Sequence, residues 1–141
     1  MATPYTKINI SFLGKISDSY LLSLNVDDFN ALLLNLLNSS IPKFKKCKTD
    51  LSLRNNIEFE EDLSDEEIEL LANLMVAEWL RPQINNLELI KHSLGSKDFQ
   101  MFSQSAHLRE LQNLRKQTQV EISKLLVDYS YNNNKLDDLH N

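Results

Sequence analysis

The side chains that could carry out chemistry are few and widely spaced. The three histidines, His92, His107 and His140, share none of the short spacings at which side chains bind a metal together. Cys47 with His92 or His107 could form a nucleophile and its base. Nothing in the sequence indicates that these residues meet, so we expect Cys47 to be a passive thiol and the chain to hold no metal.

Carboxylates gather in one segment, residues 58–69, which reads EFEEDLSDEEIE. Such a cluster could bind calcium, but the alternating oxygen ligands and central glycine of an EF-hand loop are missing from it. Gly14 and Gly95 stand alone and form no phosphate-binding loop, and no serine lies in a G-x-S-x-G elbow. The sequence therefore predicts that the protein is not an enzyme, has no catalytic residue and needs no cofactor.

Composition favours one helical domain. The chain has 141 residues, 42% of them apolar and 25% charged, with only two glycines and three prolines. The net charge of -5 argues against a general affinity for nucleic acid. The basic run KFKKCK, residues 43–48, fits a solvated helix end better than a phosphate site. We expect neither a disulfide nor a membrane segment, and we expect the protein to stay in the compartment where it is made.

Residues 8–16 are compatible with a strand or with a short helix. Their β-branched isoleucines favour a strand, but Ile8, Phe12 and Ile16 fall at helical spacing, and we predict a helix. A second helix is expected to begin after Asn25, which can cap it, and to end near Ser40 because Pro42 restricts the residue before it.

The clearest local signal is a capping box at residues 64–67. Ser64 followed by Glu67 predicts that a helix begins here. Its apolar residues lie on most of its circumference, so this helix should be central to the fold. Pro82 should kink or split it, and Gly95 should end the helical stretch that follows.

The last helix is expected to begin at Ser103 or Ser105 and to run to about Tyr131. The predicted fold is thus all-α: a small bundle of about four helices with a long C-terminal helix and an extended, flexible C-terminal tail. Residues 1–131 form the single domain, and residues 132–141 form a tail that is flexible unless a partner binds it. Trp79 could be an interface anchor, but its helical spacing favours the core. The predicted core includes Leu33, Leu36, Leu71, Met75, Trp79, Leu111, Ile122 and Leu125.

The segment 94–108, LGSKDFQMFSQSAHL, places apolar side chains in a turn between two helices. Phe99, Met101 and Phe102 either fold back over the end of the bundle or face a neighbouring molecule. The sequence leaves both possibilities open, although folding back is the default for apolar residues between packed helices.

Several motifs follow one another in a fixed order. They are LANLMVAEWLRPQINN (71–86), SLGSKDFQMFSQSAHLREL (93–111) and LVDYSY (126–131), preceded by FLGKISDSYLLSL (12–24) and IPKFKKCKTDLS (41–52). Together they resemble a family of small helical neck proteins of tailed bacteriophages, of the head-tail connector adaptor or head-completion type. The similarity covers most of residues 12–131.

This resemblance implies a structural protein of the virion neck, assembled in the host bacterial cytoplasm. Its partners would be the portal protein, neighbouring copies of itself in a ring, commonly of twelve, and the next neck or tail-completion protein. Channel DNA would pass nearby without sequence-specific binding. A ring uses two different patches on each copy. Candidate interface regions are the acidic connection 55–63 and the residues Lys97, Asp98, Phe99, Met101, Phe102, Tyr129, Tyr131, Leu136 and Leu139.

An alternative is a small helical regulator that binds a host protein or DNA. Binding to DNA would need a helix with clustered basic residues, and only RELQNLRKQ (109–117) is a candidate. Arg109, Arg115 and Lys116 in this segment lack the wider basic surface that nucleic-acid binding usually shows.

Overall fold

The computed structural model describes residues 2–16, 24–94 and 104–140. Of the described residues, 74% are helical, in four α-helices, which confirms the predicted all-α bundle. In chain order the elements are β1 (Thr3–Pro4), α1 (Tyr5–Leu13), α3 (Val26–Ser40), the 3₁₀ turn η1 (Ile41–Lys43), β2 (Glu58–Phe59), α4 (Asp65–Leu94) and α6 (Gln104–His140).

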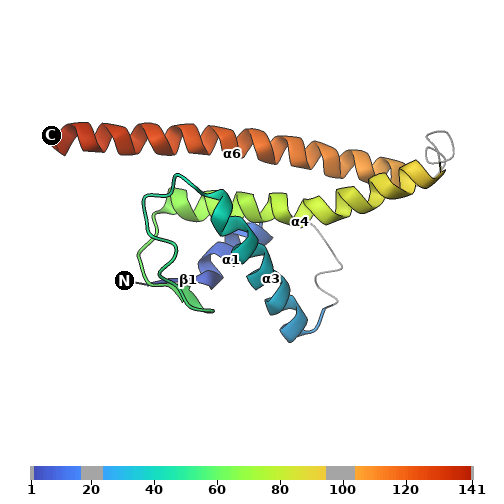
Figure 1. The fold of residues 1–141 in the computed structure, drawn as a ribbon, viewed down its shortest axis with the longest axis horizontal. Helices are drawn as coiled ribbons and strands as arrows, with labels where there is room; N and C mark the ends of the chain where they lie inside the picture. The colour runs from blue at the N-terminus through green and yellow to red at the C-terminus, as the bar shows by residue number, and fades with distance from the viewer. Residues whose placement is uncertain (1, 17–23, 95–103, 141) are drawn as a thin grey trace.

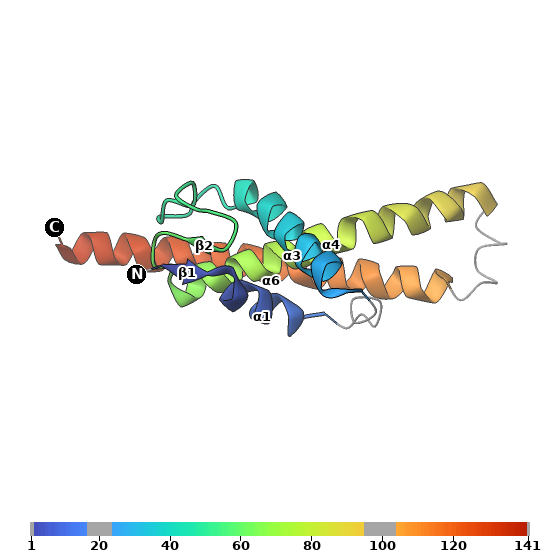
Figure 2. The same ribbon diagram turned by 90° about the horizontal axis from the view of Figure 1, so that it is seen from below.

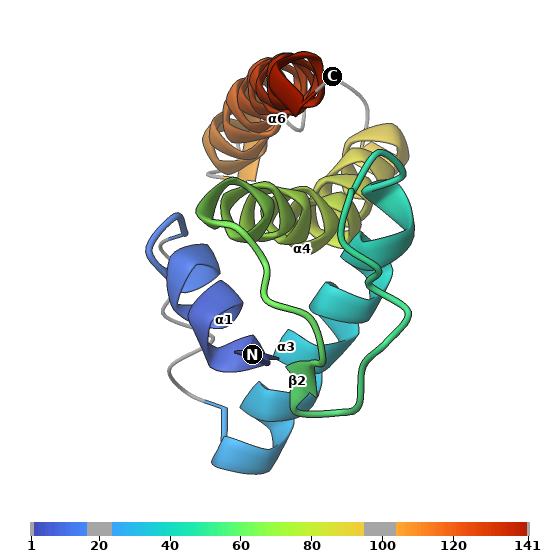
Figure 3. The ribbon, with the colours of Figure 1, turned by 90° about the vertical axis from the view of Figure 1, so that its left-hand side faces the viewer.

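The helices form layers around α4. Helix α6 packs on one side of α4, and α1 and α3 pack on the other (Figure 3). Helices α4 and α6 run antiparallel as one long pair, and α6 continues past the N-terminal end of α4 (Figure 1). Because α1 and α3 cover only the N-terminal part of α4, the other end of the pair projects beyond the body (Figure 2).

The central position predicted for the helix after the capping box is confirmed. Side chains on several sides of α4 are fully buried, including Leu71, Met75 and Leu80. Pro82 does not split the helix, which runs through it to Leu94, although its axis bends in the second half (Figure 1). A bend is expected, because proline removes one N–H donor and clashes with the preceding turn. Gly95, the predicted stop, lies just outside the described residues.

Local signals at α1 and α3 gave the right element types. Residues 5–13 are helical, so the helix interpretation of this region is confirmed, with a start at Tyr5. Asn25 caps α3, since its Oδ1 accepts a hydrogen bond of 2.8 Å from the Asp28 N–H. The helix ends at Ser40, directly before the turn that contains Pro42.

A short antiparallel pair of strands, which the sequence did not indicate, ties the N-terminus to the segment before α4. In it Thr3 is opposite Phe59. The hydroxyl of Thr3 donates to the Glu61 carbonyl at 2.9 Å and accepts from the Leu63 N–H at 2.9 Å. Thr3 is itself buried, so these two bonds fix the approach to α4 in a place that water does not reach.

One apolar cluster joins all four helices. Trp79 belongs to it, as the core interpretation predicted. Leu125 is half-buried against it, whereas Ile122 is half-buried and does not belong to the buried cluster. Ile122 was therefore wrongly assigned to the core: among the described helices α4 provides the main packing surface for α6, so side positions of α6 stay open. The predicted core residues that are buried are Leu33, Leu36, Leu71, Met75, Trp79 and Leu111.

The end of α6 also differs from the prediction. The helix was expected to end near Tyr131, but its backbone stays helical to His140. The segment NNNKLDDLHN contains neither glycine nor proline. A helix that is already formed extends at little cost through such residues, because only its first turn is expensive to make.

Candidate functional site

Most predicted interface residues lie outside what the structure describes. This holds for Lys97, Asp98, Phe99, Met101 and Phe102, which fall between the described ranges. Leu136 and Leu139 belong to α6, in a part where only the backbone is described.

The two tyrosines of the predicted interface have opposite environments. Tyr131 is 65% exposed, as an interface residue must be before its partner binds. Tyr129 is 3% exposed, so its assignment to an exposed interface was wrong. Its ring packs edge-on against Phe44, with ring centroids 5.5 Å apart. Tyr129 thus belongs to the core, where it holds α6 to the segment that follows α3.

Polar side chains converge on the buried carboxylate of Glu67, and we call this group the Glu67 network: Cys47, Thr49, Ser64, Glu67 and Tyr129. Oε1 accepts from the Ser64 N–H at 2.9 Å and from the Thr49 hydroxyl at 2.8 Å. Oε2 accepts from the Tyr129 hydroxyl at 2.9 Å, the Cys47 thiol at 3.1 Å and the Thr49 N–H at 3.3 Å. Five donors from three parts of the chain therefore share one carboxylate.

The capping box is the local origin of this network. The Glu67 N–H donates to the Ser64 hydroxyl at 3.2 Å while the carboxylate reaches back to the Ser64 N–H, as the sequence predicted. The far side of the network is closed by Tyr129, whose oxygen also accepts from the Lys48 N–H at 2.7 Å. The network thus joins the start of α4, the segment 47–49 and α6.

Burial and hydrogen bonds set the protonation states of Glu67, Cys47 and Tyr129. Burial raises the pKa of Glu67, but the bonds from Ser64, Cys47, Thr49 and Tyr129 lower it more, so its pKa lies below the ordinary 4.5. Burial, and then the bond to Glu67 and its charge, raise the pKa of Cys47 from 9.0 to about 12. Burial raises the pKa of Tyr129 as well. At neutral pH the carboxylate is ionised and both neighbours keep their protons.

This arrangement supports stability rather than catalysis. A nucleophilic cysteine needs a lowered pKa, and that of Cys47 is raised. His92 and His107 are exposed, whereas the thiol of Cys47 is directed to Glu67. Within the described residues, no three metal-ligating side chains are grouped so that they could hold an ion.

The network should make the protein sensitive to acid. The lowered pKa of Glu67 contributes stability that is complete above 4.5, the ordinary value, and is lost as the pH falls through the folded-state value. Urea unfolding followed by circular dichroism should therefore give a falling free energy of unfolding between about pH 5 and pH 3.

Glu67→Gln should flatten this pH dependence, because glutamine does not titrate. The control is Glu61→Gln, a change of the same kind at an exposed side chain, which should keep the wild-type slope. Equal slopes for Glu67→Gln and wild type would assign the acid sensitivity to other carboxylates, such as Glu69. Hydrogen bonds from Lys15 and Ser11 lower the pKa of Glu69 against the opposing effect of burial.

Apolar side chains also line the face of α6 that points away from α4. Val120, Val127 and Tyr131 are 63%, 67% and 65% exposed, and we call them the outer stripe. Their spacing of seven and then four residues keeps them on one helix face. Each lies two positions from a buried residue, either Thr118 or Tyr129. At about 100° per residue, two positions point to roughly opposite sides of a helix. The stripe is therefore outside the fold's own core.

The three basic residues of the segment 109–117 do not form one exposed face of α6. Arg109 and Lys116 are exposed, while Arg115 is half-buried and lies on another side of the helix.

The described helices include none that is both long and apolar enough to cross a membrane. Comparison of the chain with protein-family models, curated proteins and solved structures found no match.

Proposed function

We propose that the chain is a structural component of the tailed-phage virion neck. In this role it is an adaptor, or head-completion protein, that docks as a ring on the portal, links head to tail and continues the DNA channel. The proposal begins from the motifs in residues 12–131 that resemble neck proteins. It locates the protein in the virion and gives it no enzymatic activity.

The observation that carries the proposal furthest is the outer stripe of α6. A subunit in a ring needs two different patches that meet head to tail, in addition to its own core. The outer stripe supplies an apolar patch on a helix whose opposite face is already covered by α4. Leu89 and Ile90, 65% and 40% exposed near the end of α4, supply a second patch. The two patches lie on different helices, so each copy can present one of them to each of its two neighbours in a head-to-tail contact.

Electron microscopy of the protein mixed with the portal of the same phage tests this function. The wild-type protein should add a ring of density to the portal. The triple variant Val120→Ser, Val127→Ser and Tyr131→Ser should fold, because all three side chains are exposed, yet add little or no density. The loss follows because binding energy concentrates in a few apolar and aromatic side chains.

The matched control is Val26→Ser, which alters an equally exposed valine, 73% exposed, at the start of α3. It should assemble like the wild type. A portal that gains no density from the wild-type protein would refute the adaptor assignment. A triple variant that assembles normally would leave the adaptor role in place and remove the outer stripe from its interface.

A further inference from the structure

The segment that follows α3 carries a closely spaced group of exposed lysines. Lys43, Lys45, Lys46 and Lys48 lie within six residues, and we call this group the lysine turn. The sequence favours the solvated end of a helix here. Helix α3, however, ends at Ser40 and has no basic residue in its last turn, so the lysines do not stabilise the end of α3.

Two successive backbone turns hold the lysine turn in place. The Phe44 N–H donates to the Ile41 carbonyl at 3.1 Å, and the Cys47 N–H donates to the Phe44 carbonyl at 3.4 Å. Phe44 is buried and packs against Tyr129, whose oxygen also accepts from the Lys48 N–H. The segment therefore lies against α6 (Figure 1), and the lysine side chains are on the outside of a fixed support.

The positive charges of the lysine turn are not neutralised by ion pairs. None of its four lysines forms an ion pair within the part of the chain that the structure describes. Asp50, the next acidic residue along the chain, accepts instead from the N–H and the hydroxyl of Ser52. Glu67, which the Cys47 thiol reaches, is buried and shared by five donors. Charges farther than about 8–10 Å away are largely screened at physiological salt, so the net charge of -5 does not cancel this local excess.

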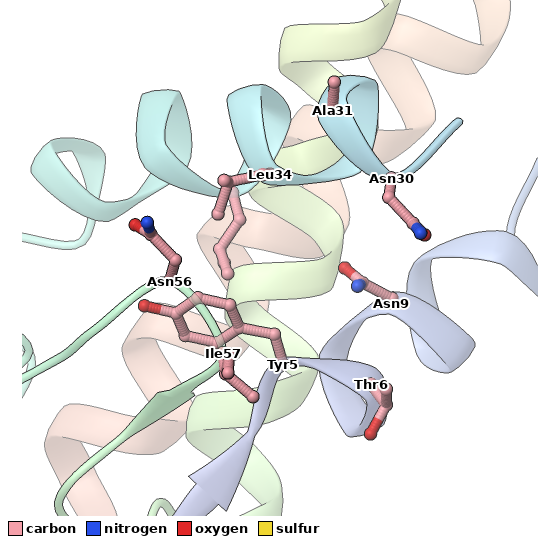
Figure 4. Close-up of a pocket in the computed structure, with 9 residues that line it drawn as sticks. Tyr5, Thr6, Asn9, Asn30, Ala31, Leu34, Asn56 and Ile57 are labelled. Atoms are coloured by element: carbon pink, nitrogen blue, oxygen red, sulfur yellow. The ribbon is translucent and has the colours of Figure 1, made fainter. Parts of the chain in front are cut away.

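Other positive charges of the described chain are more widely spaced. The exposed Arg109, Lys116 and Lys124 of α6 are seven and eight residues apart, or about 10–12 Å along the helix axis. A pocket of about 350 Å³ between α1 and α3, lined in part by Asn9 and Ile57, has no charged side chain in its lining (Figure 4). The lysine turn is therefore the surface best suited to an anionic partner.

The composition of the turn indicates which anion it suits. Its exposed side chains are lysines, and its one aromatic ring, that of Phe44, is buried. Protein interfaces are poor in lysine, and their binding energy comes largely from aromatic, apolar and arginine side chains. Single-stranded nucleic acids stack their bases on exposed aromatic rings, and membrane-surface segments insert apolar side chains. Duplex DNA needs neither, because it carries a phosphate charge about every 1.7 Å and releases counterions when lysines bind it.

The size of the turn matches a short stretch of duplex. Six residues span at most about 20 Å, so the four lysines can reach one stretch of about six base pairs. We propose that the lysine turn binds the phosphate backbone of double-stranded DNA without reading its sequence. Each lysine supplies a point charge on a flexible stem, which can follow the backbone. The contact goes beyond the proposed place in the virion and does not depend on it, since it needs neither a portal nor a ring.

Fluorescence anisotropy of a labelled duplex of about 20 base pairs, titrated with the full chain, tests this contact. At about 50 mM salt we expect a Kd of roughly 10–100 μM, as is usual for contacts that do not depend on sequence. The affinity should fall as salt is added, with a slope of log K against log salt of about -3.6 for four phosphates. Duplexes of unrelated sequence should bind equally well, and a single strand of the same length should bind more weakly.

The double variant Lys45→Gln and Lys46→Gln tests the turn directly. It should bind the duplex at least about tenfold more weakly and make the salt slope shallower by about 2. Both side chains are exposed, so its circular dichroism spectrum should match that of the wild type. The matched control, Lys7→Gln with Lys91→Gln, removes the same charge from two exposed lysines on α1 and α4. It should bind within about twofold of the wild type.

Three results would overturn the proposal. The first is an anisotropy that stays constant up to about 1 mM protein at about 25 mM salt. The second is an equal loss of affinity in the two double variants, which would make the attraction a property of net charge alone. The third is tighter binding, through Lys45 and Lys46, of poly-glutamate or of phosphatidylserine vesicles than of the duplex at the same salt. That result would make the turn a site for an acidic protein or for lipid headgroups.

Discussion

Glu67→Ala is expected to lower the free energy of unfolding by about 4 kcal/mol. The carboxylate accepts five hydrogen bonds, and Glu67 is only 3% exposed. Alanine leaves those five donors without their acceptor at a position where the Glu67 side chain was buried. Hydrogen bonds to a charged group are worth about 1.5–3 kcal/mol each, but they are not independent, so the total is well below their sum. Urea unfolding at pH 7 measures the difference.

Tyr129→Phe separates the parts of this effect, because it removes one donor and keeps the ring against Phe44. Its cost should be about 1–2 kcal/mol, which includes the loss of the acceptor for the Lys48 N–H. The exposed Glu61→Ala should cost less than about 0.5 kcal/mol. A Glu67→Ala protein as stable as Glu61→Ala would contradict the role given to the network.

Phe12→Ala should have a comparable effect by a different mechanism, a loss of about 4 kcal/mol. Phe12 lies on α1 and is fully buried in the apolar cluster that joins the four helices. The variant loses the transfer free energy that the ring gains when it leaves water. It also leaves a cavity where α1 packs against the body. The cooperative unfolding transition should move to lower urea concentration with little change in slope.

Ile10→Ala on the same helix is the matched control. Ile10 is 71% exposed, so its truncation should change stability by less than about 0.5 kcal/mol. Similar losses for both variants would mean that α1 contributes through helix formation alone and not through the packing of Phe12. This pair of variants therefore measures how strongly α1 is attached to α4.

What the sequence predicted well was local. The Asn25 cap, the Ser64–Glu67 capping box and the end of α3 before Pro42 all depend on residues within a few positions of one another. Their hydrogen bonds follow from backbone geometry, so they do not depend on what the rest of the chain does.

What the sequence did not predict depends on distant contacts. The capping box gave the bond between Ser64 and Glu67, but the Tyr129 hydroxyl reaches Glu67 across 62 residues. No periodicity encodes such a meeting, and Tyr129 was assigned to the interface for that reason. The meeting of Asn9, Asn30 and Ile57 around one pocket was equally hidden, because these residues come from α1, α3 and the segment before α4 (Figure 4).

The outer stripe could have been predicted from the sequence but was missed. The helical pattern of α6 was used to find one buried face, and Val120 and Val127 were left over. Residues left over at spacings of seven and four are themselves a pattern. A second apolar face on a long helix indicates that something other than its own domain covers it.

The span between Glu67 and Tyr129 also has a consequence for biosynthesis. The chain is made from the N-terminus, so Glu67, Cys47 and Thr49 leave the ribosome well before the residue that completes their network. Until α6 is synthesised, α4 lacks the cover on one of its apolar sides and Glu67 lacks one of its donors. The nascent protein therefore reaches its full stability only after the part of α6 that contains Tyr129 has emerged. A chain that ends before this point is less stable, so chaperones bind it and proteases cleave it more readily.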